Sequence, residues 1–78
     1  MVLLRLCDIL ENESCVIKKF HESMEKKTRE RLSNLGIFPE TIVEVLANNH
    51  NGYILKAIGA TYALSKSFGE IIYVERIT

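Results

Sequence analysis

The hydrophobic pattern after Pro39 is the feature that most restricts what this chain can fold into. Side chains in Thr41–Ala47 alternate between two faces, as in a β-strand. A turn cluster, Asn48–Gly52, follows, and its Asn-Gly pair is a strong hairpin signal. Tyr53–Ile58 is the predicted returning strand. Residues 41–58 are therefore expected to form a β-hairpin.

Both faces of this predicted hairpin are rich in apolar side chains. One face is expected to fill the protein interior, and it comprises Val43, Val45, Tyr53, Leu55 and Ala57. The opposite face carries Ile42, Leu46, Ile54 and Ile58. A helix is expected to cover some of this second set. Any that stay exposed form an apolar patch, and such patches mark interaction sites.

One α-helix is predicted, over Ser23–Leu35. Ser23 is a suitable N-cap, and Glu25 lies in the first turn, where the helix dipole favours a carboxylate. A narrow apolar stripe recurs at helical spacing, formed by Met24, Thr28, Leu32 and Leu35. Gly36 and Pro39 end the helix. A stripe this narrow favours a helix that lies across the mouth or edge of a sheet.

The remaining elements are short. Strands are predicted at Val2–Leu6, Ser14–Phe20 and Ile71–Ile77, and single helical turns at Leu6–Ile9 and Tyr62–Phe68. A chain of 78 residues is long enough for one domain, 1–78. The expected fold class is mainly β with one α-helix, arranged as a small, partly open β-barrel of about five strands.

Composition excludes several classes of protein. With 47% hydrophobic and 26% charged residues, the chain is neither a disordered segment nor a membrane-spanning one. The N-terminus lacks the pattern of a signal peptide. Net charge is zero, although 18–31 holds six basic and three acidic residues, a local excess of +3. That excess is typical of a solvated face and weak for a nucleic-acid binder.

No catalytic or cofactor-binding constellation stands out. There is no nucleophile–base pair, no phosphate-binding glycine loop and no set of metal ligands at motif spacing. Cys7 and Cys15 are expected to be buried as small hydrophobic residues. His21 and His50 are expected at the surface. The sequence leaves room for weak Fe(II) or Zn(II) binding at His21, His50 or Cys15, but predicts no cofactor.

The segment Arg31–Pro39, followed by Val43-x-Val45 and a hairpin, resembles the Arg-Leu-x-x-Leu-Gly-Ile-x-Pro-Gly pattern of the FeoA family and of the C-terminal domains of iron-responsive repressors. The resemblance covers nearly the whole chain and implies an SH3-like barrel. Three residues depart from the family pattern. Glu40 and Asn12 stand where glycine is usual, which concerns turn geometry, and Gly69 stands where alanine is common.

The resemblance also implies a function. A FeoA-like protein is expected in the cytoplasm, where it binds the cytoplasmic part of the FeoB ferrous-iron transporter and catalyses no reaction. Candidate partner-binding residues are Lys26, Arg29, Asn51, Gly52, Tyr53, Ile54 and Ile58. One alternative is a free-standing regulatory module related to the repressor domains. A weaker one is an RNA-binding barrel that uses Lys18, Lys19, Lys26 and Arg29, which the zero net charge disfavours.

Overall fold

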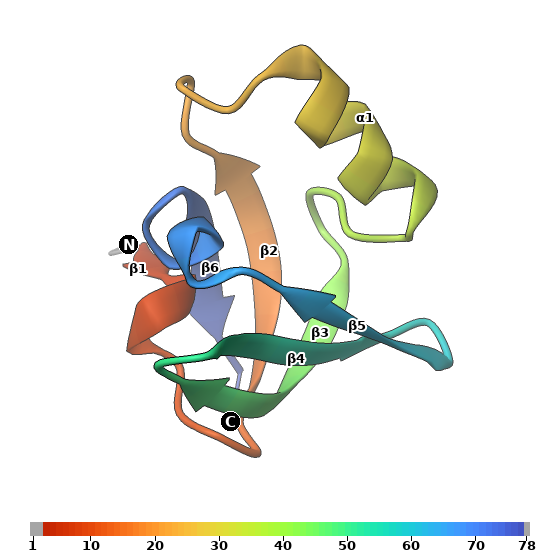
Figure 1. The fold of residues 1–78 in the computed structure, drawn as a ribbon. Coiled ribbons are helices and arrows are strands. Elements are labelled where there is room, and N and C mark those ends of the chain that lie inside the picture. The colour runs from red at the N-terminus through yellow and green to blue at the C-terminus, as the bar shows by residue number, and fades with distance from the viewer. Residues whose placement is uncertain (1–2, 78) are drawn as a thin grey trace.

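The computed structural model, which describes residues 3–77, folds six antiparallel strands into one curved sheet with a single α-helix at one end (Figure 1). The elements in chain order are β1 (Leu4–Arg5), the 3₁₀ turn η1 (Leu6–Asp8), β2 (Ser14–Phe20), α1 (Lys26–Asn34), β3 (Ile42–Asn49), β4 (Gly52–Ala57), β5 (Ala60–Leu64), the 3₁₀ turn η2 (Lys66–Glu70) and β6 (Ile72–Arg76).

The strand order is β1-β6-β2-β3-β4-β5. β3 and β4 form the predicted hairpin, with Asn49 opposite Gly52 across a two-residue turn, so β3 extends further into the asparagine cluster than expected. Irregularities between Val45 and Ala47 in β3 and between Ile17 and Lys19 in β2 help the sheet to curve. β1 and β5 end the sheet without pairing to each other, so the barrel is partly open.

The predicted inner face of the hairpin is confirmed. Val43, Val45, Tyr53, Leu55 and Ala57 are all buried. Alternating residues of β2 and β6 complete this core, together with the last residue of β5 and residues in and around η1 and α1. They are Leu6, Ile9, Cys15, Ile17, Met24, Leu32, Ile37, Leu64, Ile72 and Val74. Leu32 is therefore the buried anchor of the helix, while Leu35, expected beside it, is half-buried against the core.

The helix is shorter at its start than predicted. α1 begins at Lys26, and its N-cap, Glu25, makes no side-chain capping bond. Ser23 is occupied elsewhere, because its hydroxyl lies 2.8 Å from His21 Nδ1 and its own N–H donates to the same nitrogen at 3.0 Å. The Met24 N–H also donates to the His21 carbonyl. Residues 21–24 thus form a local turn, and the expected cap at Ser23 was wrong.

The helical turn predicted for Tyr62–Phe68 was also wrong. Ala60–Leu64 is a strand, β5, and a 3₁₀ turn follows only at Lys66–Glu70. The cause is the two-residue turn at Ile58-Gly59, where both residues have positive φ, which sends the chain straight back along β4. The sheet therefore has six strands, one more than expected. β1 is limited to Leu4–Arg5 among the described residues, and Val2 lies outside them.

The two residues that stand where the family has glycine both adopt the backbone conformation that glycine favours. Asn12 has φ 69° and Glu40 has φ 73°, the left-handed region that glycine favours. Asparagine tolerates this region. Glu40 gains an ion pair, since Lys18 Nζ lies 3.1 Å from its Oε1.

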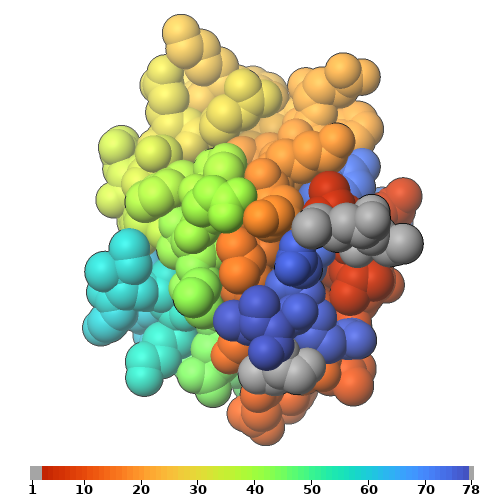
Figure 2. Space-filling view, turned by 180° about the vertical axis from the view of Figure 1, so that it is seen from behind, coloured from red at the N-terminus to blue at the C-terminus, as the bar shows by residue number. Residues whose placement is uncertain are grey.

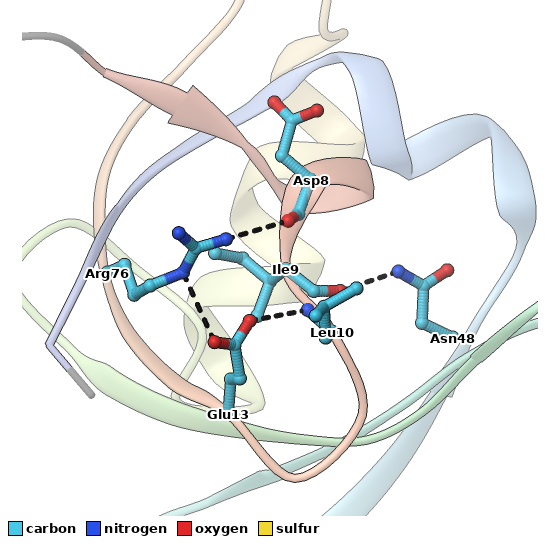
Figure 3. Close-up of polar contacts among 6 residues, drawn as sticks. All are labelled: Asp8, Ile9, Leu10, Glu13, Asn48 and Arg76. Carbon is cyan, nitrogen blue, oxygen red and sulfur yellow. Dashed lines mark hydrogen bonds and ion pairs between the residues drawn. The ribbon is translucent and has the colours of Figure 1, made fainter.

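A polar network joins the loop after η1 to strands from both sides of the barrel (Figure 3). Arg76 of β6 donates from Nη2 to the Asp8 carbonyl at 3.1 Å and pairs through Nε with Glu13 Oε2 at 3.3 Å. Glu13 Oε1 accepts the Leu10 N–H at 2.8 Å. Asn48 of β3 donates to the Ile9 carbonyl at 2.6 Å. The loop is thereby fixed to both β6 and β3.

Gly69 has a packing role. The Tyr53 side chain crosses from β4 to η2, and a Cβ at Gly69 would overlap the Tyr53 hydroxyl and lie 3.1 Å from the Cβ of Cys7. The hydroxyl is buried and has no hydrogen-bond partner among the described residues. Burial, followed by the charges of Cys7, Asp8 and Glu70, raises the pKa of Tyr53. Glycine at 69 is therefore required by the tyrosine at 53.

We predict that Gly69→Ala destabilises the fold by about 1–3 kcal/mol, because the added methyl group must displace the Tyr53 ring. Tyr53→Phe should lie within about 1 kcal/mol of wild type, since it removes an unpaired buried hydroxyl. Urea unfolding of the two single variants and of the double variant measures the coupling free energy between positions 53 and 69. A Gly69→Ala protein as stable as wild type would contradict this packing.

Candidate functional site

The outer face of the β3–β4 hairpin is the most conspicuous apolar surface of the molecule. Ile42, Ile54 and Ile58 expose 59%, 43% and 73% of their area, and we call these three residues the isoleucine surface. Glu44 and Lys56 are opposite one another in the register. Continuing that register by two residues brings Ile42 and Ile58 to the same end of the hairpin.

Figure 2 shows this face from behind, with β3 in green beside the turn after β4 in cyan. The helix was expected to cover part of the outer face, but these three side chains remain in solvent. Leu46, the fourth apolar residue expected there, is half-buried. Ile42 and Ile58 adjoin at one end of the hairpin, and exposed apolar patches on soluble proteins mark interaction sites.

Ile58 is held in a costly conformation. Its φ of 47° is unusual for a β-branched residue, and the turn position it occupies normally holds asparagine or aspartate before the glycine. Its side chain reaches back over the end of α1, where its Cδ1 would lie 3.2 Å from a Cβ at Gly36. Such strain costs roughly 1–3 kcal/mol and concentrates at functional sites. Of the three isoleucines, Ile58 therefore has the strongest structural indication of a functional role.

The other predicted contacts are separated from one another. Asn51 is exposed in the β3–β4 turn, but Gly52 and Tyr53 are buried and belong to the core. Lys26 and Arg29 are exposed on α1, and Arg29 donates from Nη2 to the Met24 carbonyl at 3.2 Å. Only Ile54 and Ile58 of the seven candidates belong to the isoleucine surface. Ile42, which belongs with them, was recognised in the sequence as an outer-face residue but was not chosen as a contact.

No cluster of three or more histidine, cysteine or acidic side chains suited to a metal ion occurs within residues 3–77. His50 is exposed, and His21 is half-buried with its Nδ1 directed at Ser23. Cys15 is buried as predicted, but Cys7 is exposed, contrary to expectation. The helical pattern of η1 explains the difference, since it buries Leu6 and turns the next side chain outward.

We predict that the two thiols differ sharply in reactivity. Burial, and then the charge of Glu13, raise the pKa of Cys15 to about 11, and only the thiolate is nucleophilic. Ellman's reagent at pH 8 should therefore modify one thiol quickly in the folded protein and both in denaturant. Cys7→Ser should remove the fast reaction and Cys15→Ser should preserve it. Two thiols with equal rates in the folded state would contradict the burial of Cys15.

Comparisons with known proteins agree on family and fold. The family model of the FeoA domain matches residues 4–76. A comparison of the sequence with curated proteins finds no match. A crystal structure of an iron uptake regulatory protein, FeoA, is 17% identical with a TM-score of 0.83, covering 97% of this chain and 100% of that one.

Two further structures are similar. The solution structure of a FeoA-like protein from Clostridium acetobutylicum is 19% identical with a TM-score of 0.81, covering 100% of this chain and 91% of that one. A manganese-dependent transcriptional repressor is 14% identical with a TM-score of 0.85, but this chain, 99% covered, spans only 42% of the repressor. At these identities the likeness establishes the fold, and it confirms the small SH3-like barrel expected from the sequence.

Proposed function

Because this chain belongs to the FeoA family, we propose that it is a cytoplasmic accessory protein of ferrous-iron uptake that binds the cytoplasmic part of the FeoB transporter. It acts through a surface and not through a reaction. Membrane association comes from that partner, and no helix among residues 3–77 is long and apolar enough to cross a bilayer.

The observation that carries this proposal is the isoleucine surface. Three exposed isoleucines on the hairpin and its following turn supply apolar side chains of the kind that protein interfaces bury. Glu44 and Lys56, between them in the register, supply polar groups that orient a partner. The strained turn at Ile58 holds the most exposed of the large apolar side chains at the end of the hairpin. A rigid support of this kind lowers the entropy lost on binding.

We predict that Ile42→Ser weakens binding to the FeoB cytoplasmic domain by about tenfold or more, because loss of a large apolar contact that an interface buries costs more than about 1 kcal/mol. Biolayer interferometry with the immobilised domain measures this. Leu10→Ser is the matched control, since Leu10 is 65% exposed on a loop outside the hairpin. Absence of binding by the wild-type protein at high micromolar concentration would overturn the proposed function. Equal losses in both variants would remove the isoleucine surface from it.

Ile58→Asn should separate stability from binding. Asparagine accepts positive φ and makes the preferred Asn-Gly turn, so the free energy of unfolding should rise by about 0.5–1 kcal/mol. Binding to the FeoB domain should fall, because the most exposed apolar side chain is gone. Urea unfolding and the binding assay are run on the same preparation. A variant that gains stability and keeps full affinity would show that Ile58 is not a contact.

A second candidate function rests on the likeness to the manganese-dependent repressor. The chain would then be a free-standing regulatory module that binds a peptide or a transcription factor. The neighbouring genes distinguish the two candidates, since a transporter gene favours the first and a repressor gene the second. The same binding assay, run with that repressor in place of the FeoB domain, tests it directly.

A further inference from the structure

The two edges of the sheet are protected very differently. β1 is two residues long and carries Arg5, and a short, charged edge strand discourages pairing with other chains. β5 is five residues long and contains neither a charged residue nor proline. It pairs with β4 alone among the described residues. The edge at β5 therefore lacks the features that keep strands from accepting another.

The pairing of β5 shows which backbone groups are free. The two-residue turn at Ile58-Gly59 makes Ala57 and Ala60 a hydrogen-bonded pair. Because such pairs alternate in antiparallel sheets, the N–H and C=O groups of Thr61 and Ala63 point away from β4. No hydrogen bond joins these groups to another described residue. They form a short template for an added strand.

A groove of about 340 Å³ lies between this edge and α1, which is above β5 in Figure 1. Its walls are mainly apolar, and they include Leu32, Leu35, Leu64 and Phe68. Arg31 is the only charged residue among those that line it. Arg31 makes no ion pair with any residue from 3 to 77. The groove thus offers hydrophobic walls and one unpaired cation beside the free backbone groups of the β5 edge, of which Ala63 lines the groove.

We propose that the free edge of β5 accepts an extended segment of another protein, with an acidic side chain facing Arg31 and an apolar side chain packed between Leu35 and Phe68. A segment of five residues matches β5, which spans roughly 17 Å. Its main chain pairs with Thr61 and Ala63. The proposal concerns the chemistry of the segment and holds whichever protein supplies it.

Charge selects this occupant over a second copy of the chain. α1 carries Lys26, Lys27, Arg29 and Arg31 against Glu30, a net charge of +3. Pairing two β5 strands would bring two such helices to the same junction, and like charges repel there. An acidic segment is attracted to the basic helix, whereas a second copy of the chain is repelled. The groove therefore favours a foreign, negatively charged strand.

The test uses the full chain and a synthetic probe, acetyl-Thr-Val-Thr-Glu-Thr-amide, whose valine and glutamate lie on the same face of an extended strand. The comparison peptide has a lysine in place of the glutamate. We expect the acidic peptide to bind with a dissociation constant below about 1 mM and the basic one to bind at least tenfold more weakly. Amide proton exchange should slow at Thr61 and Ala63. Arg31→Glu should weaken binding of the acidic peptide at least about fivefold. Lys26→Glu, the same charge change on the same helix outside the groove, should alter it less.

Four outcomes would overturn the inference. These are no binding of the acidic peptide below about 1 mM, equal binding of both peptides, an equal effect of the two charge reversals, or exchange that slows elsewhere and not at Thr61 and Ala63. Sedimentation of the protein alone supplies a further check, because a dimer with protected Thr61 and Ala63 amides would assign the edge to a second copy. Binding of FeoB by the isoleucine surface is measured separately, so either proposal can fail alone.

Discussion

The packing of Tyr53 against η2 is the contact on which the shape of this barrel depends. β1 and β5 do not pair, so backbone hydrogen bonds alone leave the sheet open. Tyr53 extends from β4 to Gly69 and Cys7, which joins the hairpin to the two 3₁₀ turns. Lys66 reinforces the same junction. Its ammonium lies 4.5 Å from the centre of the Tyr53 ring and donates to Asn48 Oδ1 at 2.8 Å. Side-chain packing thus holds together the part of the barrel where β1 and β5 do not pair.

Because side chains and not strand pairing close the barrel, some backbone groups and apolar side chains remain exposed at other places on the surface. A fully hydrogen-bonded barrel has no edges, whereas this one retains the outer edge of β5. Its small size adds a second effect, because a domain of this length buries only about 60% of the surface exposed by the unfolded chain. Buried side chains from β2, β3, β4, β5 and β6 already fill the core, and the isoleucines on the outer face of β3–β4 have no layer to cover them. Both exposed features follow from the architecture.

The sequence predicted most of what alternation and turn chemistry control. The β3–β4 hairpin, its inner residues and β2 at Ser14–Phe20 were all expected from period-two patterns. The predictions were wrong where a local interaction that the pattern does not show determines the structure. His21 takes the Ser23 hydroxyl away from the helix, and the turn at Ile58-Gly59 makes a strand of Ala60–Leu64. Nothing in a single sequence shows that isoleucine will adopt positive φ, so the turn at Ile58-Gly59 was not accessible beforehand.

The candidate surfaces were harder to predict than the fold, for a related reason. Periodicity states which side chains share a face, but it does not say whether another element covers that face. Ile42 and Ile54 became surface residues only because α1 lies at the end of the barrel and not over the hairpin. Tyr53 was expected both on the inner face and among the partner contacts, and its burial against η2 removes it from the contacts. A binding function on a scaffold this small therefore depends on where one short helix is placed, which is decided by tertiary packing.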